Sequence, residues 1–262
     1  MRLIPTSSLC LLTLFCQTGM AAELANSNIP TDGRFSMSVG ATYDSGDYGA
    51  SIDTNVWSTP IGLKYRIGLW SFGISTSWLH VTSPNSVDAD GNFIGGGGAK
   101  TTEKGIGDTY LSTTYNLLDD RNYAVGLDVK GSLKIPTANE NKFLGSGKTD
   151  YGLNVEAYKT INDWTPYLNL GYKWKGSPDN IEYNNIWTTS LGFDYAVNRD
   201  LILGASYDWQ EKVTRFSDNA KEGSIYANYH LNDNNKINGY LLRGFSDASP
   251  NWGGGVTLVH YL

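Results

Sequence analysis

Cysteine is almost absent from this chain, which has 262 residues and only two cysteines, Cys10 and Cys16. Both lie in the first 22 residues, where Arg2 is followed by a short apolar stretch over 9–15 and by the small residues of 19–22. This arrangement is typical of a secretory signal peptide, which is too short to span a membrane as a helix. We therefore expect residues 1–22 to be a signal peptide, and the mature chain to contain no thiol and no disulfide.

Long apolar runs and basic clusters are also missing. No stretch after residue 22 has 18 consecutive apolar residues, which excludes a transmembrane helix. The formal net charge is −6 and lysines and arginines do not cluster, so nucleic acid is not expected as a partner. Charged residues make up 18% of the chain, against about a quarter in a typical soluble domain. If such a chain crosses a membrane, it does so as a closed β-barrel, which satisfies every backbone hydrogen bond within the sheet.

Apolar and polar residues alternate over most of the chain, most clearly at 123–135. Odd positions there, such as Leu127 and Leu133, are apolar or glycine, while even positions, such as Asp128, are polar or small. Alternate residues of a strand point to opposite faces, so one face suits lipid and the other water. Runs of this type begin near Phe35, Trp57, Trp70, Leu111, Tyr123, Tyr151, Leu168, Trp187, Leu201, Ile225, Ile237 and Trp252. They predict an all-β fold, an antiparallel up-and-down transmembrane barrel of about twelve strands over 34–262, preceded by a periplasmic segment over 23–33.

Short connections alternate with long ones along the chain. The short ones lie near Gly68 and at 119–121, 161–163, 198–200 and 233–235; the long ones cover roughly 44–55, 83–104, 136–147, 176–185 and 211–222, and a somewhat shorter one covers 246–251. Tight periplasmic turns and long outer loops are typical of outer-membrane barrels, whereas a soluble sandwich has no reason to alternate in this way. We therefore expect the chain in the bacterial outer membrane, with both termini in the periplasm.

Aromatic residues concentrate near the ends of the predicted strands. The expected girdle consists of Trp57, Trp78, Trp174, Trp187 and Trp209 near the long loops, and of Trp70, Tyr123 and Trp164 near the short turns. Two such bands are what a bilayer with two interfaces favours. Core packing in a water-soluble barrel is the alternative.

The inward faces predict which residues line the lumen. These are Lys64, Arg66, Asp108, Asp128, Lys130, Lys134, Asp150, Glu156, Asn169, Lys173, Asp194 and Asp208. Both signs of charge are present, so the row describes either a solute path or a set of cross-strand ion pairs that fills the lumen. Eight-stranded barrels are filled and those of sixteen or more strands are open, so twelve strands suit a narrow polar passage. Mixed charges would not make it a strong ion filter.

Several motifs resemble those of a known family, the outer-membrane β-barrel transporters of the phenol-degradation meta-pathway type. They lie at 105–111, 115–117, 130–137, 144–147 with Asp150-Tyr151, 169–172 and 243–252, and the resemblance spans 35–262. It implies an outer-membrane channel for hydrophobic or aromatic compounds. Such barrels usually end in an aromatic residue, typically Phe, that the barrel-assembly machinery reads. This sequence departs from that pattern because it ends in Leu262, which shares the lipid-facing phase with His260.

Two local patterns resemble a metal-binding or a phosphate-binding loop, and for both an interpretation without a bound ligand is favoured. Residues 147–149 look like the end of a phosphate-binding loop, but Lys142 stands where that loop needs its first glycine, and a strand follows. Residues 88–92 resemble the start of a calcium loop, but Ala99 occupies its twelfth position. A solvated outer loop explains them better, with weak divalent binding near lipopolysaccharide as the alternative. No metal site and no cofactor are predicted.

The sequence as a whole predicts a channel for the passive passage of small solutes, hydrophobic or aromatic compounds among them. The alternative is a plugged structural or binding barrel that acts through its extracellular loops. An enzyme ranks third, because His230 and Ser224 share an inward face but are six residues apart on one strand, about 20 Å at the rise of a strand. We expect no catalytic residue. The expected partners are outer-membrane lipid and lipopolysaccharide, the barrel-assembly machinery and a small-molecule solute.

Overall fold

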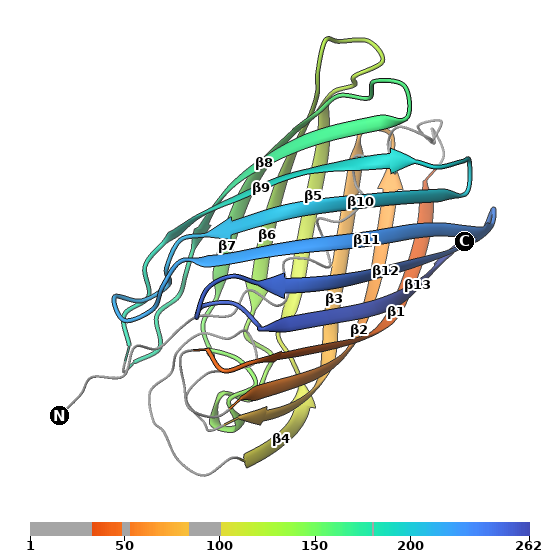
Figure 1. Ribbon diagram of the computed structural model, residues 1–262. Coiled ribbons are helices and arrows are strands. Elements are labelled where there is room, and N and C mark those ends of the chain that lie inside the picture. Colours follow the sequence, from red (N-terminus) through yellow and green to blue (C-terminus); the bar gives the residue numbers. More distant parts are fainter. Residues whose placement is uncertain (1–32, 49–52, 84–100, 180) are drawn as a thin grey trace.

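The computed structural model describes residues 33–48, 53–83, 101–179 and 181–262, which form one antiparallel sheet closed into a barrel (Figure 1). The predicted signal peptide, residues 23–32 of the periplasmic segment and the calcium-like stretch at 88–92 lie outside the described residues. The strands are β1 (Arg34–Gly46), β2 (Thr54–Ile67), β3 (Trp70–Ser83), β4 (Thr101–Ile106), β5 (Thr109–Leu118), β6 (Gly126–Ile135), β7 (Asp150–Tyr158), β8 (Trp164–Trp174), β9 (Ile186–Ala196), β10 (Leu201–Gln210), β11 (Ala220–Asn232), β12 (Asn235–Gly244) and β13 (Trp252–Tyr261).

Thirteen strands occupy twelve positions in the wall, because β4 and β5 share one position. β5 pairs with one half of β3 (Trp70 to Ser75), and β4 pairs with its other half (Trp78 to Ser83). Between them the backbone N–H of Gly107 donates to the carbonyl oxygen of Ser77 at 2.8 Å, so the interrupted strand stays attached to the wall. The predicted all-β barrel of twelve antiparallel strands is confirmed.

The barrel closes where the first strand meets the last. β1 pairs with β13 from Ser36 opposite Tyr261 to Ser45 opposite Trp252, and on its other side β1 pairs with β2. Apart from the β4–β5 interruption, where β5 pairs with β3, every other strand pairs with its neighbours in the sequence, as an up-and-down barrel requires. Among the described residues the only helix is the single turn Glu140–Lys142, and none of their helices is long and apolar enough to span a membrane.

Side chains alternate between the two faces of the closed sheet. On β7, Tyr151, Leu153 and Val155 are exposed, while the intervening Asn154 and Glu156 are only 6% and 7% exposed. Since the sheet is closed, the exposed apolar face is the outside of the barrel and the buried polar face is the inside. The pattern is the reverse of a soluble protein, whose apolar side chains are buried. It suits a wall whose outer surface meets hydrocarbon.

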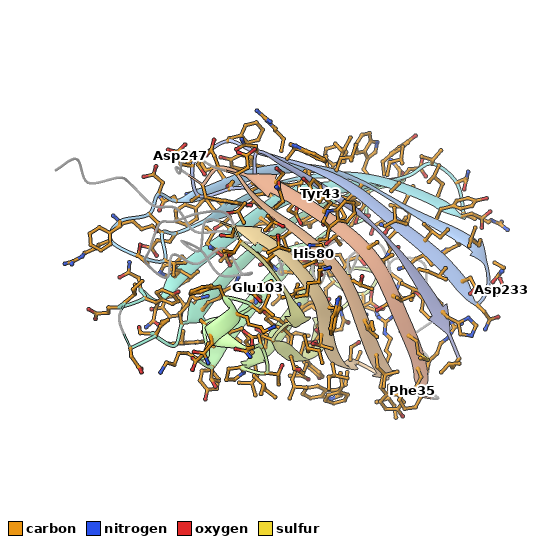
Figure 2. The ribbon with its side chains drawn as sticks, turned by 90° about the horizontal axis from the view of Figure 1, so that it is seen from below. Phe35, Tyr43, His80, Glu103, Asp233 and Asp247 are labelled. Carbon is orange, nitrogen blue, oxygen red and sulfur yellow. The ribbon has the colours of Figure 1, made fainter. Side chains whose placement is uncertain are left out.

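Aromatic rings pair across neighbouring strands at both ends of the barrel. Near the long loops the ring centroids of Tyr43 and Trp57 are 4.6 Å apart, and near the short turns those of Trp70 and Tyr115 are also 4.6 Å apart. Figure 2 shows the two ends, with Phe35 and Asp233 at the short-turn end and Glu103 and Asp247 toward the long-loop end. Of the predicted girdle, Trp57, Trp70, Trp78, Tyr123, Trp164, Trp174 and Trp187 are exposed and Trp209 is half-buried. Their contact with lipid headgroups stays a prediction.

Several strand ends differ from the prediction. The predicted loops at 44–55, 83–104 and 211–222 are shorter than expected, because β1 extends to Gly46, β4 begins at Thr101 and β11 begins at Ala220. Polar residues at these ends suggested loops, yet a barrel with a polar interior continues its strands with polar side chains. The opposite error occurs at 123–125, where Tyr123 lies in a turn and its N–H bonds to the carbonyl oxygen of Asp119.

We expect the substitution Leu191→Arg to impair folding into bilayers. Leu191 lies at the centre of β9, and its side chain is 60% exposed on the outer face. A cation at this depth should reduce the free energy of unfolding by about 2–4 kcal/mol, measured by denaturant titration in lipid vesicles. Leu69→Arg, in the turn between β2 and β3, is the matched control and should fold normally. Equal damage from both would show that the outer face does not contact hydrocarbon.

Candidate functional site: the barrel interior

The predicted lumen residues share the inner face of the barrel. Asp108, Asp128, Lys134, Glu156, Asn169 and Asp194 are buried, and Lys64, Arg66, Lys130, Asp150, Lys173 and Asp208 are half-buried. On the strands they alternate with the exposed apolar side chains, as the sequence periodicity predicts. Their contact with a solute stays a prediction.

One buried lysine connects three strand positions at the long-loop end. The Nζ of Lys134 lies 3.3 Å from Asp108 Oδ2 and 3.2 Å from Asp150 Oδ2, and it donates to Ser146 Oγ at 2.8 Å. Lys134 is only 3% exposed, so this charge is compensated almost entirely by protein groups. Asp150 also pairs with Lys175, at 3.0 Å. Two carboxylates around one buried ammonium fix the wall and the adjacent loop to each other.

The connection between β6 and β7, residues 136–149, folds into the barrel. Leu144 is 1% exposed and packs with the inward-facing Val56, Leu79 and Val81 of β2 and β3. The backbone N–H of Ala138 donates to Asp108 Oδ1 at 3.0 Å, which anchors the start of this connection to the break between β4 and β5. The predicted long connection at 136–147 is present, and part of it folds into the barrel. The sequence signal was the isolated Leu144 among small residues, which needs an apolar contact.

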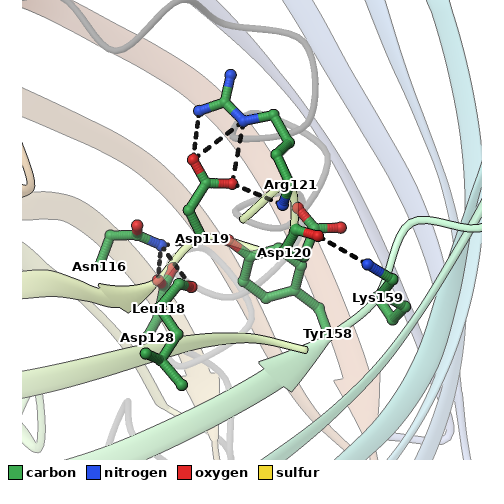
Figure 3. Close-up of polar contacts among 8 residues, drawn as sticks. All are labelled: Asn116, Leu118, Asp119, Asp120, Arg121, Asp128, Tyr158 and Lys159. Carbon is green, nitrogen blue, oxygen red and sulfur yellow. Dashed lines mark hydrogen bonds and ion pairs between the residues drawn. The ribbon is translucent and has the colours of Figure 1, made fainter. Parts of the chain in front are cut away.

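A second network closes the inner wall at the short-turn end (Figure 3). Asn116 Nδ2 donates to Asp128 Oδ1 at 2.6 Å and to the hydroxyl of Tyr158 at 3.2 Å. Beyond it, Lys159 Nζ donates to the carbonyl oxygen of Asp120 at 2.7 Å, which links the β5–β6 turn to the β7–β8 turn. Neighbouring hairpins are thereby joined by side chains as well as by the strand ladders.

On the opposite wall, carboxylates are bonded by hydroxyl groups. Tyr226 donates to Asp194 Oδ1 at 2.8 Å, and Asp208 accepts from Ser206 at 2.7 Å and from Ser190 through a very short hydrogen bond. Neutral donors stabilise a carboxylate without cancelling its charge. In this part of the interior the carboxylates are thus held by neutral hydroxyl donors.

Two inward carboxylates were not among the predicted lumen residues. Asp44 and Glu222 are 2% and 3% exposed, and both lie within strands. They had been assigned to the long loops at 44–55 and 211–222. The alternation of faces along the strands could have identified them. Asp44 follows the inward-facing Thr42 by two residues, and Glu222 precedes the inward-facing Ser224 and Tyr226 by two and four residues.

A family model described as the MetA-pathway of phenol degradation matches residues 85–261, about two thirds of the chain. The chain belongs to this family. The matched region runs from the β3–β4 connection to the end of β13, so it includes Lys134 and the inward-folded connection. The resemblance seen in the sequence motifs is thus confirmed. Among curated proteins, none matches the chain in sequence.

Solved structures with a similar fold are outer-membrane barrels, and at their low identity the likeness concerns the fold alone. The KdgM porin is 10% identical, with 85% of this chain and 98% of KdgM covered and a TM-score of 0.52. The translocator domain of the autotransporter NalP from Neisseria meningitidis is 10% identical, with 94% and 95% covered and a TM-score of 0.54. This member of the phenol-degradation family has the fold of an outer-membrane β-barrel.

We expect Lys134→Met to destabilise the barrel strongly. It leaves the buried carboxylate of Asp108 without its cation, and removing one partner of a buried ion pair costs about 3–5 kcal/mol. The readout is the free energy of unfolding in detergent micelles. Lys148→Met is the control, because the ion pair of Lys148 with Asp179 is solvent-exposed and its loss should leave stability unchanged. Similar effects of the two substitutions would contradict the anchoring role of Lys134.

The turn after β5 offers a test by pH. Hydrogen bonds from the Arg121 guanidinium, at 2.5–3.0 Å, hold the pKa of Asp119 below its usual value. The pair therefore stabilises the fold above the ordinary carboxyl pKa, and this contribution is lost as the pH falls through the lowered value. Arg121→Ala should raise the pKa of Asp119, measured by NMR titration, with little change in stability because the pair is exposed. Arg199→Ala, in the β9–β10 turn, should leave that pKa unchanged.

Proposed function

We propose that this protein is an outer-membrane channel for the passive passage of small solutes. The observation that carries the proposal is the state of the interior charges. Five inward carboxylates make no ion pair with any described residue: Asp44, Asp128, Glu156, Asp208 and Glu222. A carboxylate that has no ion-pair partner is costly to bury in a dry interior. Water and mobile ions in the lumen would supply the missing solvation.

The fold supports the same role. Twelve strands enclose more space than the filled eight-stranded barrels, and KdgM, which has a similar fold, is a porin known in complex with oligogalacturonate. Phenol degradation in the family description makes aromatic compounds the first solutes to test. We infer that the short turns and both termini face the periplasm, as in outer-membrane barrels generally. The proposed role needs no catalytic residue, and the hydroxyl of Ser224 is hydrogen-bonded to Ser206.

A plugged barrel is the second candidate, and the inward-folded connection is the observation that favours it. Leu144 and Ser146 are buried, so residues 136–149 occupy part of the cross-section at the long-loop end. In an open channel this connection forms the constriction. In a plugged barrel it forms the plug that blocks the lumen.

Planar-bilayer recordings separate the two candidates. We expect wild-type protein to show discrete conductance steps, and Leu144→Ser to give larger and less regular steps. A hydroxyl in place of the leucine weakens the apolar contacts that hold residues 136–149 against Val56 and Leu79. Leu231→Ser, on the outer face of β11, should conduct as the wild type does. Folded wild-type protein that carries no current would reject the channel.

A further inference from the structure

Three hydrogen-bond acceptors without partners lie at the long-loop end of the interior. They belong to Asp44 near the end of β1, to Tyr48 just after it and to Glu222 near the start of β11, and we call them the acceptor triad. Their side chains are 2%, 2% and 3% exposed. Asp44 Oδ2, the Tyr48 hydroxyl and Glu222 Oε1 are all buried without a hydrogen-bond partner. Buried polar atoms are almost always paired, so three unsatisfied atoms in one place call for an explanation.

The triad residues lie around the β12–β13 connection. Gly46, two residues before Tyr48, packs against Pro250, and Gly244, which stands opposite Glu222 in the ladder, also packs against Pro250. Asp44 stands opposite Gly253 at the start of β13.

Burial, and then the carboxylates of Asp44 and Glu222, raise the pKa of the Tyr48 hydroxyl well above its usual value. The phenol is therefore neutral, and its hydroxyl oxygen can accept a hydrogen bond. The charge of Asp44 also acts on Glu222, and both act on the inward-facing Tyr240.

Local packing fixes the Tyr48 ring beside Gly46 and the β12–β13 connection. A Cβ at Gly46 would lie 3.0 Å from the Tyr48 ring and 2.9 Å from the Cα of Pro250, so only glycine lets the ring and the β12–β13 connection approach this closely. Tyr48 itself has a φ of 49°, in the left-handed region that non-glycine residues seldom occupy. Strain of this kind persists where the surroundings impose it, and it is common at binding sites.

The charges around the triad leave it acidic. Asp208 is the charge that acts most strongly on Glu222, and Lys173 is the cation that acts on it. Lys173 Nζ donates to Gln210 Oε1 at 3.5 Å. Ser249 hydrogen-bonds to the Glu222 carboxylate and adds no charge.

We infer that the acceptor triad binds the primary ammonium group of a small organic cation. An ammonium group has three N–H donors, and the triad has three unpartnered acceptors. Its charge would balance the two carboxylates, and the faces of Tyr48 and Tyr240 would add cation–π attraction. A metal ion fits less well, because the described residues contain no group of three or more His, Cys, Asp or Glu arranged to hold one.

The inference refines the proposed channel by naming a chemical group on its solute. The transport of the ammonium compound depends on the proposed channel function. Its binding to the triad does not, because binding needs no open lumen. Two measurements therefore separate the failure of the site from the failure of the channel.

The first measurement is thermal unfolding in detergent, with methylammonium chloride as the probe and sodium chloride of equal ionic strength as the reference. A ligand that binds only the folded state raises the melting temperature. We expect methylammonium to do so for the wild type, to lose this effect in the double variant Asp44→Asn/Glu222→Gln and to have a reduced effect in Tyr48→Phe. Asp247→Asn/Glu182→Gln removes two exposed carboxylates from loops at the same end and should keep the full effect. If the double variant does not fold, Tyr48→Phe alone decides the comparison.

The second measurement is the permeability ratio of methylammonium to chloride, from reversal potentials in planar bilayers. We expect the ratio to fall several-fold in Asp44→Asn/Glu222→Gln and to be unchanged in the exposed double variant. A silent wild type that methylammonium nevertheless stabilises would reject the channel and keep the site. Equal melting temperatures of the wild type in the two salts would overturn the ammonium site, whether or not the protein conducts.

Discussion

Backbone hydrogen bonding in a medium without water is the constraint on which the whole structure depends. Hydrocarbon offers no partner to a peptide group, so a sheet that crosses it must pair both edges of every strand. The pairing of β1 with β13 provides this, because it joins the two edges that an open sheet would leave exposed. The ladder along β3 is interrupted where β5 gives way to β4. At this point the backbone N–H of Gly107 donates to the carbonyl oxygen of Ser77 and keeps the wall connected.

Closure also decides what the interior contains. Inward side chains are shielded from lipid, so the chain can place carboxylates, lysines and hydroxyl groups on that face without meeting hydrocarbon. At the long-loop end this freedom produces two different solutions. The cluster around Lys134 balances its charges within the protein and holds a connection in place. The acceptor triad leaves three buried polar atoms without hydrogen-bond partners, which a bound cation would satisfy.

The sequence was sufficient for the fold and for much of the interior. A period of two assigns faces directly, so residues such as Asp128 and Glu156 could be placed inside from the apolar character of their neighbours. Strand ends were harder, because Asp44 and Glu222 follow the correct phase but stand in polar surroundings that look like loops. The fold of 136–149 could not be predicted. It depends on Leu144 reaching Val56, Leu79 and Val81, which come from two distant strands, and local patterns contain no information about such contacts.

The pairing of β1 with β13 has a consequence for how the molecule is built. It joins Ser36 to Tyr261, residues at opposite ends of the barrel sequence, whereas all other ladders join strands that are close along the chain. Local hairpins form early because little loop entropy opposes them, and contacts between distant residues form late. The seam is therefore the last ladder to form. Until then β1 and β13 present open edges that can pair with another chain. A growing barrel must be protected along these two strands until the circle is complete.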